Sequence, residues 1–521
     1  MTSRRGHRLE GGLEGGPEGG PEGAAARRSL RRLAPAAASL VIAAAALLAY
    51  GPAAAGYDAS WALLWGAELL HGGQPSYEAA GAPTPHPLLN AVCVPLAALG
   101  DHSADALLGL TALTFGWLAV AAYLLGARLF SRPVGLVFAA LLLTRATLGG
   151  ETVQALVDVP YLALVVSAAA SEARRPRAGW PVLAQLGLAG LLRPEGWLLA
   201  AAYAAYLLPA LDPRARVRTA ALAAAAPLLW LASDLAITGD PLFSLHTTRD
   251  LAETLNRPRD FRAAVETAPQ YLESVLGTGV ALVGLAGCVV AAVALYERAL
   301  LPLAILGLGL LAFMALGVAG LPILTRYLLV PGVVLTLFCA VVIAGWSALP
   351  RGDPWRTRLA AAAAAGVAGV AAAIPGDARQ HDRFAAFTGG LARAQGDLER
   401  AIDDPDVRRP AATLPILTTD QRAVPLLALW LDRPPGAVST LDWGRPDAPL
   451  VFAYTDQGDA LALAIPRRLQ PPLGPGRVLY GGRTTWTVYL RERLGSASTR
   501  NLRELARERR PSASSGATSI R

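Results

Sequence analysis

Residues 33–52, LAPAAASLVIAAAALLAYGP, begin a long segment without basic side chains. From Leu33 to Ala127 the sequence contains no Arg or Lys and is dominated by Ala and Leu. A run of about 20 apolar residues is long enough for one helix to cross the hydrocarbon core of a bilayer. The segment therefore predicts helices that span a membrane.

The composition of the whole chain agrees with this prediction. Of the 521 residues, 53% are hydrophobic and only 17% are charged, which would leave a soluble protein with too much apolar surface. Every basic residue is Arg, and Ala, Gly and Pro are abundant, as the codon bias of a GC-rich bacterium would produce. The formal charge of +8 is spread in short Arg groups between apolar segments, so nucleic-acid binding is not predicted.

The three cysteines suggest no metal or disulfide site. Cys93, Cys288 and Cys339 all lie in apolar segments and have neither paired nor metal-ligand spacing. We expect them to be packing residues.

The sequence divides into four parts. Residues 1–32 are rich in Gly, Glu, Pro and Arg and are expected to form a disordered cytoplasmic tail. Residues 33–374 form the predicted membrane domain, and residues 375–506 a small extracytoplasmic α/β domain. That domain should contain a helix near 378–402 and strands at Leu414–Thr418 and Leu450–Tyr454. Residues 507–521 are expected to be a second disordered tail.

The membrane domain is predicted to be all-α, with about eleven spans. They lie near 33–52, 104–126, 133–150, 155–171, 181–192, 196–209, 217–237, 274–296, 299–319, 323–346 and 357–374.

The Arg groups between these spans predict the orientation. They are Arg128 and Arg132, Arg174 to Arg177, Arg214 to Arg218, Arg298, and Arg351 to Arg358. All fall on one side of the predicted spans, which the excess of basic residues marks as cytoplasmic. The loops at 53–103, 149–154 and 238–273, and everything after residue 374, then lie outside. The chain is thus predicted to be a multi-pass protein of the bacterial plasma membrane, with a cytoplasmic N-terminus and an extracytoplasmic C-terminal domain.

One predicted span is too short to cross a membrane. Pro181 to Leu192 is 12 residues, or about 18 Å of helix, against a hydrocarbon core of about 30 Å. Since basic loops flank both ends of residues 181–209, we expect a helical hairpin that enters the membrane and returns. Pro194 and Gly196 would break the helix at its tip.

Short polar motifs occupy the outer ends of the predicted spans. They are GYDASW at 56–61, PSY at 75–77, PHPL at 85–88, ALVDVP at 155–160, LLRPEG at 191–196, GDPLFS at 239–244 and RYLL at 326–329. Their order resembles that of GT-C membrane glycosyltransferases, in particular glycosyltransferase family 39 and the RgtA/B/C/D-like group, which are related to protein mannosyltransferases and aminoarabinose transferases. The resemblance covers roughly residues 33–346.

This resemblance implies a reaction and two catalytic carboxylates. A sugar on a polyprenyl-phosphate donor would be attacked by a hydroxyl of an envelope glycan, lipid or protein acceptor at the outer membrane surface. The resemblance places Asp58 at the position of the general base and Asp158 in the family's Asp-x-Pro element. A solvated or helix-capping Asp58 is the alternative. Asp58 is followed by Ala59 where some relatives carry an acid, so a requirement for a divalent metal stays open.

Phosphate is the leaving group of this reaction, and Arg side chains bind phosphate oxygens in pairs. Arg326 and Arg193 are the candidates for that role, and Arg145 is a third. The alternative for each is that it extends to the lipid headgroups or pairs with a nearby acid, as Arg193 could with Glu195; for Arg145 this alternative is the better interpretation. Acids at membrane depth are costly, and His86 faces outward by topology. The predicted substrate-binding residues are His86, Glu151, Arg193, Glu195 and Arg326.

Two other functions fit a polytopic chain. A transporter or lipid flippase would also have many spans, but such folds often show internal repeats, which this sequence lacks. The second is an inactive scaffold protein with a glycosyltransferase-like fold. The presence of Asp58, Asp158 and Arg326 argues against this alternative.

Overall fold

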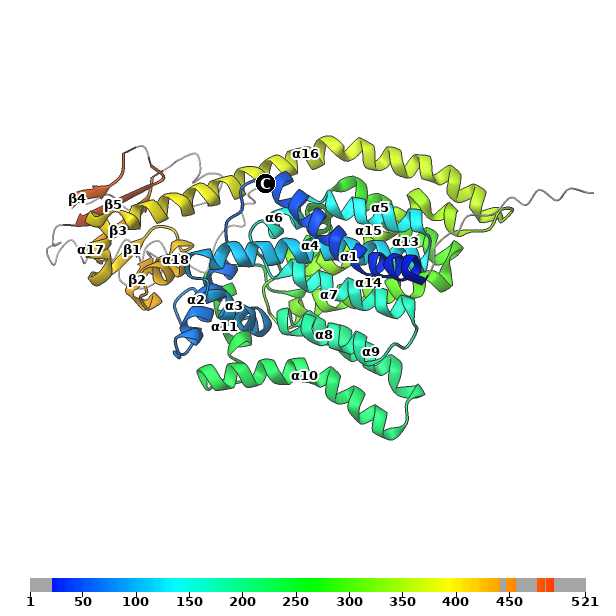
Figure 1. The fold of residues 1–521 in the computed structure, drawn as a ribbon, viewed down its shortest axis with the longest axis horizontal. Helices are drawn as coiled ribbons and strands as arrows, with labels where there is room; N and C mark the ends of the chain where they lie inside the picture. Colours follow the sequence, from blue (N-terminus) through cyan, green and yellow to red (C-terminus); the bar gives the residue numbers. More distant parts are fainter. Residues whose placement is uncertain (1–20, 441–446, 456–475, 483, 492–521) are drawn as a thin grey trace, which may run out of the picture.

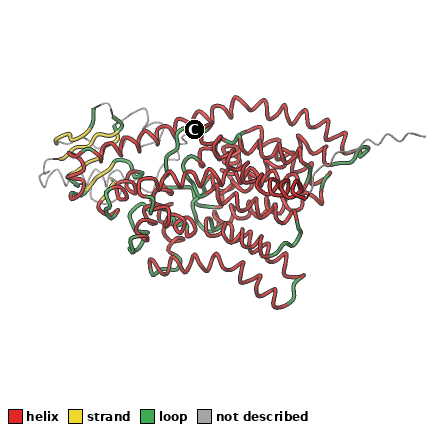
Figure 2. Tube along the Cα trace, in the orientation of Figure 1, coloured by secondary structure: helices red, strands yellow, loops and turns green. Residues whose placement is uncertain are grey.

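The computed structural model describes residues 21–440, 447–455, 476–482 and 484–491. Within these ranges the chain is mostly helical, and one small sheet lies toward the C-terminal end (Figures 1 and 2). The predicted helical architecture with a small C-terminal α/β part is confirmed at this level. Residues 1–20 and 507–521 of the predicted tails lie outside the described residues. The first helix begins at Pro21, earlier than predicted, because Ala24 to Ala26 and the following Arg and Leu residues favour helix.

Eighteen α-helices lie in the described part of the chain. They are α1 (Pro21–Ala49), α2 (Tyr57–Leu70), α3 (Pro87–Ala97), α4 (Ser103–Leu129), α5 (Arg132–Leu143), α6 (Ala146–Thr152), α7 (Asp158–Arg174), α8 (Trp180–Leu192), α9 (Glu195–Leu207), α10 (Pro213–Thr238), α11 (Phe243–Thr254), α12 (Phe261–Leu276), α13 (Thr278–Ala294), α14 (Tyr296–Val318), α15 (Leu329–Ala344), α16 (Pro354–Asp403), α17 (Pro405–Thr413) and α18 (Ala423–Trp430).

Each of the eleven predicted spans overlaps a helix, but fewer helices are long and apolar enough to cross a membrane. Among the described residues five meet that requirement, or up to seven if each of two bent helix pairs forms one span. The bent pairs are α5 with α6, at 64°, and α12 with α13, at 110°. The helices are thus compatible with membrane insertion, and eleven spans stay a prediction.

Close helix packing surrounds α15, whose side chains are almost all buried. It packs against α5, α13, α14 and α16. A Cβ added to Gly284 or Gly287 of α13 would lie 2.5 or 2.2 Å from a backbone oxygen of α15. Small residues at these positions let the two backbones approach, as is common between helices in membranes.

The predicted hairpin at residues 181–209 is present as α8 and α9. The Trp197 indole donates a hydrogen bond to the Gly190 carbonyl at 2.8 Å, and the Gly179 N–H donates to the Tyr203 hydroxyl at 3.1 Å. The two helices therefore run side by side in opposite directions. A Cβ at Gly196 would lie 2.7 Å from the Gly190 nitrogen, so the tight turn requires glycine there.

The long helix α16 joins the helical part to the sheet. It spans 50 residues and crosses the predicted domain boundary at residue 374, so the helix expected near 378–402 is its second half. In Figure 1 it runs along one edge of the molecule and ends beside the strands. No separate linker marks the boundary, because the chain stays helical through Pro375.

The C-terminal sheet has the strand order β2-β1-β3-β5-β4. Its strands are β1 (Ile416–Thr418), β2 (Val438–Thr440), β3 (Leu450–Tyr454), β4 (Gly476–Tyr480) and β5 (Trp486–Arg491). Both predicted strands are confirmed as β1 and β3, which pair in parallel. Asp397 of α16 accepts hydrogen bonds from the Tyr480 hydroxyl, at 2.7 Å, and from the Trp486 N–H, at 2.8 Å, and so fixes the sheet to the helix.

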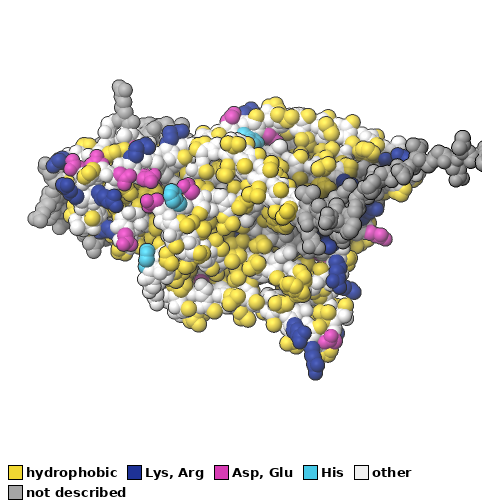
Figure 3. Space-filling view, viewed as in Figure 1, with side chains coloured by type: hydrophobic (Ala, Val, Ile, Leu, Met, Phe, Trp, Pro, Cys, Tyr) yellow, Lys and Arg dark blue, Asp and Glu magenta, His cyan; other side chains and the backbone are white. Residues whose placement is uncertain are grey.

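The surface has an apolar middle and charged ends. Figure 3 shows hydrophobic side chains across the middle of one face, with most charged side chains gathered toward the two ends. On α13, Leu282, Val289 and Val293 are each more than 60% exposed, which suits contact with lipid.

The contact between α1 and α4 gives a test of this packing. A Cβ at Gly116 of α4 would lie 2.1 Å from the Ser39 carbonyl oxygen of α1, whereas a Cβ at Gly109, on the same helix, meets nothing within 4 Å. We expect Gly116→Ala to lower the free energy of unfolding by about 2 kcal/mol because the helices must separate. Gly109→Ala should change it by less than about 1 kcal/mol. Thermal unfolding of the purified protein in detergent measures both; equal effects would contradict the close approach.

Candidate functional site

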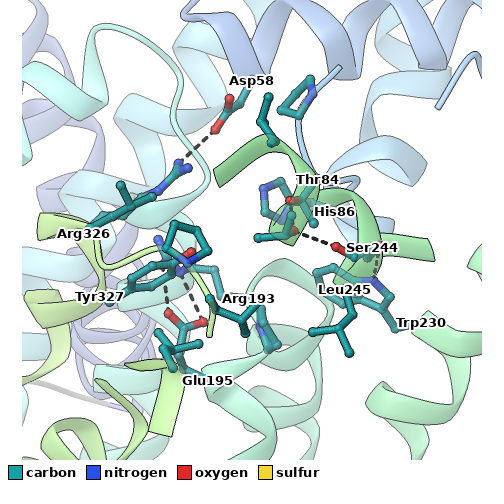
Figure 4. Close-up of a pocket in the computed structure, with 18 of the residues that line it drawn as sticks. Asp58, Thr84, His86, Arg193, Glu195, Trp230, Ser244, Leu245, Arg326 and Tyr327 are labelled. Atoms are coloured by element: carbon teal, nitrogen blue, oxygen red, sulfur yellow. Dashed lines mark hydrogen bonds and ion pairs between the residues drawn. The ribbon is translucent and has the colours of Figure 1, made fainter. Parts of the chain in front are cut away.

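A cavity of about 490 Å³ brings five of the seven predicted site residues together. Asp58, His86, Arg193, Glu195 and Arg326 all line it, and Figure 4 shows their side chains around one space. They come from α2, the loop before α3, the turn between α8 and α9, and the turn before α15. The volume is in the range of sites that hold small molecules, roughly 300–1,000 Å³.

Asp58 and Arg326 form the central ion pair of the cavity. The Arg326 Nη1 donates to the Asp58 Oδ2 at 2.9 Å, across 268 positions of sequence. Asp58 is the second residue of α2, and its side chain is 15% exposed. Burial opposes its charge, but the charge and hydrogen bond of Arg326, together with more distant groups such as Arg257, hold the pKa of Asp58 below its ordinary value. Asp58 is therefore a carboxylate at neutral pH.

Arg193 is held by two acids. Its guanidinium forms an ion pair with Asp158, at the start of α7, and a second with the Glu195 Oε1 at 2.8 Å. It also lies 4.9 Å from the centre of the Tyr327 ring. Asp158 is fully buried and does not line the cavity. This placement suits a residue that positions Arg193, and not one that contacts a substrate.

Glu151 and Arg145 lie outside the cavity lining. Glu151, on α6, is buried, and its Oε2 has no hydrogen-bond partner among the described residues. It is within electrostatic range of Arg193 and Arg326. Arg145 pairs with Asp377 of α16 at 3.0 Å and donates to the Leu276 carbonyl, so it makes a structural contact, as the alternative interpretation expected.

His86 lines the cavity, and one of its ring nitrogens is buried. It precedes α3, whose first residue is Pro87, and its Nδ1 is buried without a hydrogen-bond partner in the described part of the chain. Its ring meets the Trp230 ring edge to face, with centroids 6.0 Å apart. Burial lowers the pKa of His86 from 6.5 to about 4, so the ring is neutral at pH 7.

Several polar residues of the cavity were not singled out from the sequence, among them Arg257, Asp234 and Gln421. Arg257 follows α11 and adds a third guanidinium to those of Arg193 and Arg326. Asp234 of α10 accepts hydrogen bonds from the backbone and side chain of Ser244, at 2.9 and 3.0 Å, and so fixes α11. Gln421 comes from the loop after β1, in the C-terminal domain. No spacing in the sequence links these positions to Asp58, because their proximity arises from the fold.

The rest of the cavity lining is largely apolar. It is formed by helices α9, α10, α11 and α14 with the loop that follows α14, and includes Leu198, Leu231, Leu245, Leu251, Leu255, Ala312, Ala315, Leu316, Leu321 and Leu324. The cavity thus has a charged part around Asp58 and an apolar wall. Such a surface fits a ligand with an anionic group and a hydrocarbon chain.

Comparison with known proteins adds no relative. No protein-family model matches the chain, and no curated protein has a matching sequence. Among the described residues no group of three or more His, Cys, Asp or Glu side chains is placed to hold a metal ion.

The neutral state of His86 predicts a pH dependence of stability. The buried ring has a pKa of about 4, whereas an exposed histidine titrates near 6.5, so the unfolded chain takes up the proton first as the pH falls. The contribution of the neutral His86 to the free energy of unfolding is therefore complete above about pH 6.5. As the pH falls from 6.5 to 4, the free energy of unfolding decreases by at most about 3 kcal/mol through this group. In His86→Gln the apparent melting temperature should fall less across this window than in the wild type. The exposed His71 provides the control: His71→Gln should behave as the wild type. Parallel declines for all three proteins would contradict a neutral buried His86.

Proposed function

We propose that this protein is a membrane glycosyltransferase. It moves a sugar from a polyprenyl-phosphate donor to a hydroxyl of an envelope glycan, lipid or protein at the extracytoplasmic face. The observation that carries the proposal is the composition of one cavity, in which the Asp58 carboxylate, three guanidinium groups and a long apolar wall meet. Each part corresponds to one part of the reaction.

The donor is an anion on a hydrocarbon chain. Arg326 and Arg257 present guanidinium groups whose planar N–H forks suit phosphate oxygens. Arg193, held by Asp158 and Glu195, adds a fixed positive group to the same space. The wall formed by α10, α11 and α14 would bury the first isoprene units, which gives the donor affinity without contact to its sugar.

The transfer assigns a task to each charged group. The acceptor oxygen bonds to the anomeric carbon of the sugar as the bond from that carbon to the phosphate oxygen breaks. The proton of the acceptor hydroxyl passes to the Asp58 carboxylate, and the electron pair of the broken bond stays on the phosphate. The guanidinium groups of Arg326 and Arg257 stabilise this developing negative charge, because they are already in place before the reaction.

The position of the site on the helices supports an extracytoplasmic reaction. Asp58 lies after the end of α1 and Arg193 at the end of α8, whereas Asp158 lies at the start of α7 and Arg326 just before the start of α15. These helix ends therefore all lie on the side of the helical part that contains the cavity. The Arg groups at 174–177, 214–218 and 351–358 lie at the other ends of α7, α10 and α16. An excess of basic residues is typical of the cytoplasmic side.

The C-terminal domain adds one residue to the cavity. Gln421 lines it, and its neighbours Asp420 and Arg422 act electrostatically on Tyr57, next to Asp58. The domain packs on α2, the helix that carries Asp58, through α18. The Gln421 amide has no hydrogen bond within the described residues, and an amide of this kind suits sugar or acceptor hydroxyls. We assign it to acceptor binding, since it lies at the carboxylate end of the cavity.

Asp58→Asn tests the role of the carboxylate. The amide keeps the shape of the side chain but cannot accept the proton, so transfer from radiolabelled polyprenyl-phosphate sugar should fall by at least about 100-fold. The exposed Asp105, with a side chain that is 80% exposed, provides the matched control, and Asp105→Asn should retain full transfer. Undiminished transfer by folded Asp58→Asn would remove Asp58 from the reaction.

Gln421→Ala tests the contribution of the C-terminal domain. Loss of one neutral hydrogen bond to the acceptor should raise its KM by about threefold to tenfold, with kcat and the KM of the donor little changed. Gln74→Ala removes an exposed amide that does not line the cavity and should change neither constant. An unchanged acceptor KM in Gln421→Ala would contradict acceptor binding at this residue.

A further inference from the structure

A second cavity lies at the other end of α7 from the candidate site. It has a volume of about 450 Å³ and opens between α4, α7 and α8. Along α7 its lining begins at Ser167, about 14 Å from Asp158, and reaches Arg174, about 24 Å away. Its lining shares no residue with that of the first cavity. The proposed transfer reaction makes no use of it.

Three arginines and no acid line this cavity. Arg128 ends α4, and Arg174 and Arg175 end α7. One N–H of Arg128 donates to the Ala170 carbonyl at 2.6 Å, and within the described ranges Arg174 and Arg175 form no ion pair or hydrogen bond through their side chains. The local charge is therefore positive and uncompensated by the lining, which favours an anion.

The nearby acid Glu172 forms no ion pair with these arginines in the described part of the chain. Its carboxylate accepts hydrogen bonds from the Arg177 N–H, at 2.7 Å, and the Ala178 N–H, at 3.2 Å. The Tyr203 hydroxyl donates to the same carboxylate at 2.6 Å. Glu172 thus holds the turn between α7 and α8, and it does not line the cavity.

One buried hydrogen-bond acceptor beside the cavity has no donor in the described structure. Trp117 donates to the Ser167 hydroxyl at 2.8 Å, and the Gln185 amide donates to the Ser171 hydroxyl at 3.4 Å. The Gln185 Oε1 is buried and has no donor among the described residues. A buried acceptor without a partner is costly, so a ligand that brings a hydroxyl would stabilise this place.

The remaining lining is apolar and leads away from the arginines along α4. Leu124 and Ala121 lie one and two helical turns before Arg128, respectively, and Trp117, which is 40% exposed, lies further along the same helix. The cavity thus has a basic rim at the helix ends and an apolar groove at depth. A lipid has its charged headgroup and its acyl chains in the same relation.

We propose that this cavity binds the headgroup of an anionic phosphoglycerol lipid. Arg174, Arg175 and Arg128 bind the phosphodiester, a headgroup hydroxyl donates to the Gln185 Oε1, and an acyl chain follows α4. A headgroup with an ammonium group fits less well, because the lining offers three guanidinium groups and no carboxylate. The inference takes the membrane location from the proposed function but does not depend on sugar transfer.

Native mass spectrometry of the purified full chain in detergent tests this site. Phosphatidylglycerol should bind, and phosphatidylethanolamine should bind at least about tenfold more weakly. The double variant Arg174→Gln/Arg175→Gln should bind phosphatidylglycerol at least about tenfold more weakly than the wild type, since charged hydrogen bonds are lost. Both side chains are exposed, so the variant should fold as the wild type does.

The matched control is Arg214→Gln/Arg218→Gln, which removes the same charge from exposed positions of α10, outside the cavity. It should bind phosphatidylglycerol as the wild type does. Equal losses in the two double variants would overturn the site, because they would show a diffuse charge effect. Equal binding of the two lipids would also overturn it. Displacement of the lipid by equimolar glycerol 3-phosphate would assign the cavity to a soluble phosphoester and overturn the lipid. Transfer activity enters none of these results, so they are independent of the glycosyltransferase proposal.

Discussion

The ion pair between Asp58 and Arg326 is the contact on which the candidate site depends. It joins the start of α2 to the turn before α15, and it keeps a carboxylate charged in a largely buried place. A buried charge without its partner is strongly destabilising, so each residue requires the other. A phosphate that binds Arg326 would compete for the same guanidinium and leave Asp58 nearer to an unpaired state, in which it is a stronger base. The same pair thus stabilises the cavity and, in the proposed reaction, would link donor binding to proton acceptance.

A second layer of charges supports this pair. Asp158 and Glu195 together hold Arg193, and Asp234 fixes α11 through Ser244. Glu195 and Asp234 also line the cavity, but Glu195 shares Arg193 with the buried Asp158, and Asp234 accepts both hydrogen bonds of Ser244. Asp58 pairs with Arg326, the residue to which the proposed reaction assigns the phosphate. This difference is the reason why we assign proton transfer to Asp58 and not to Asp158, Glu195 or Asp234.

Much of the fold could be predicted from the sequence, because long apolar runs and breaks at proline and glycine act locally. The hairpin at Arg193 to Gly196 and strands β1 and β3 were predicted from such signals. The continuous α16 was not, because the change from apolar to polar composition near Ile374 indicates a change of surroundings and not an end of the helix. For the site, motifs placed Asp58, His86, Arg193, Glu195 and Arg326, and the structure brings them to one cavity. Arg257 and Gln421 could not be predicted, since only the packing of α11 and of the C-terminal domain brings them near Asp58.

The most direct measurement is an experimental structure of the full chain with a polyprenyl phosphonate sugar, an analogue that cannot transfer its sugar. The account predicts that the phosphonate lies within hydrogen-bond distance of the Arg326 guanidinium, with the prenyl chain against α10, α11 and α14 and the anomeric carbon facing Asp58. A ligand bound elsewhere, with Asp58 and Arg326 still paired and the cavity empty, would contradict it.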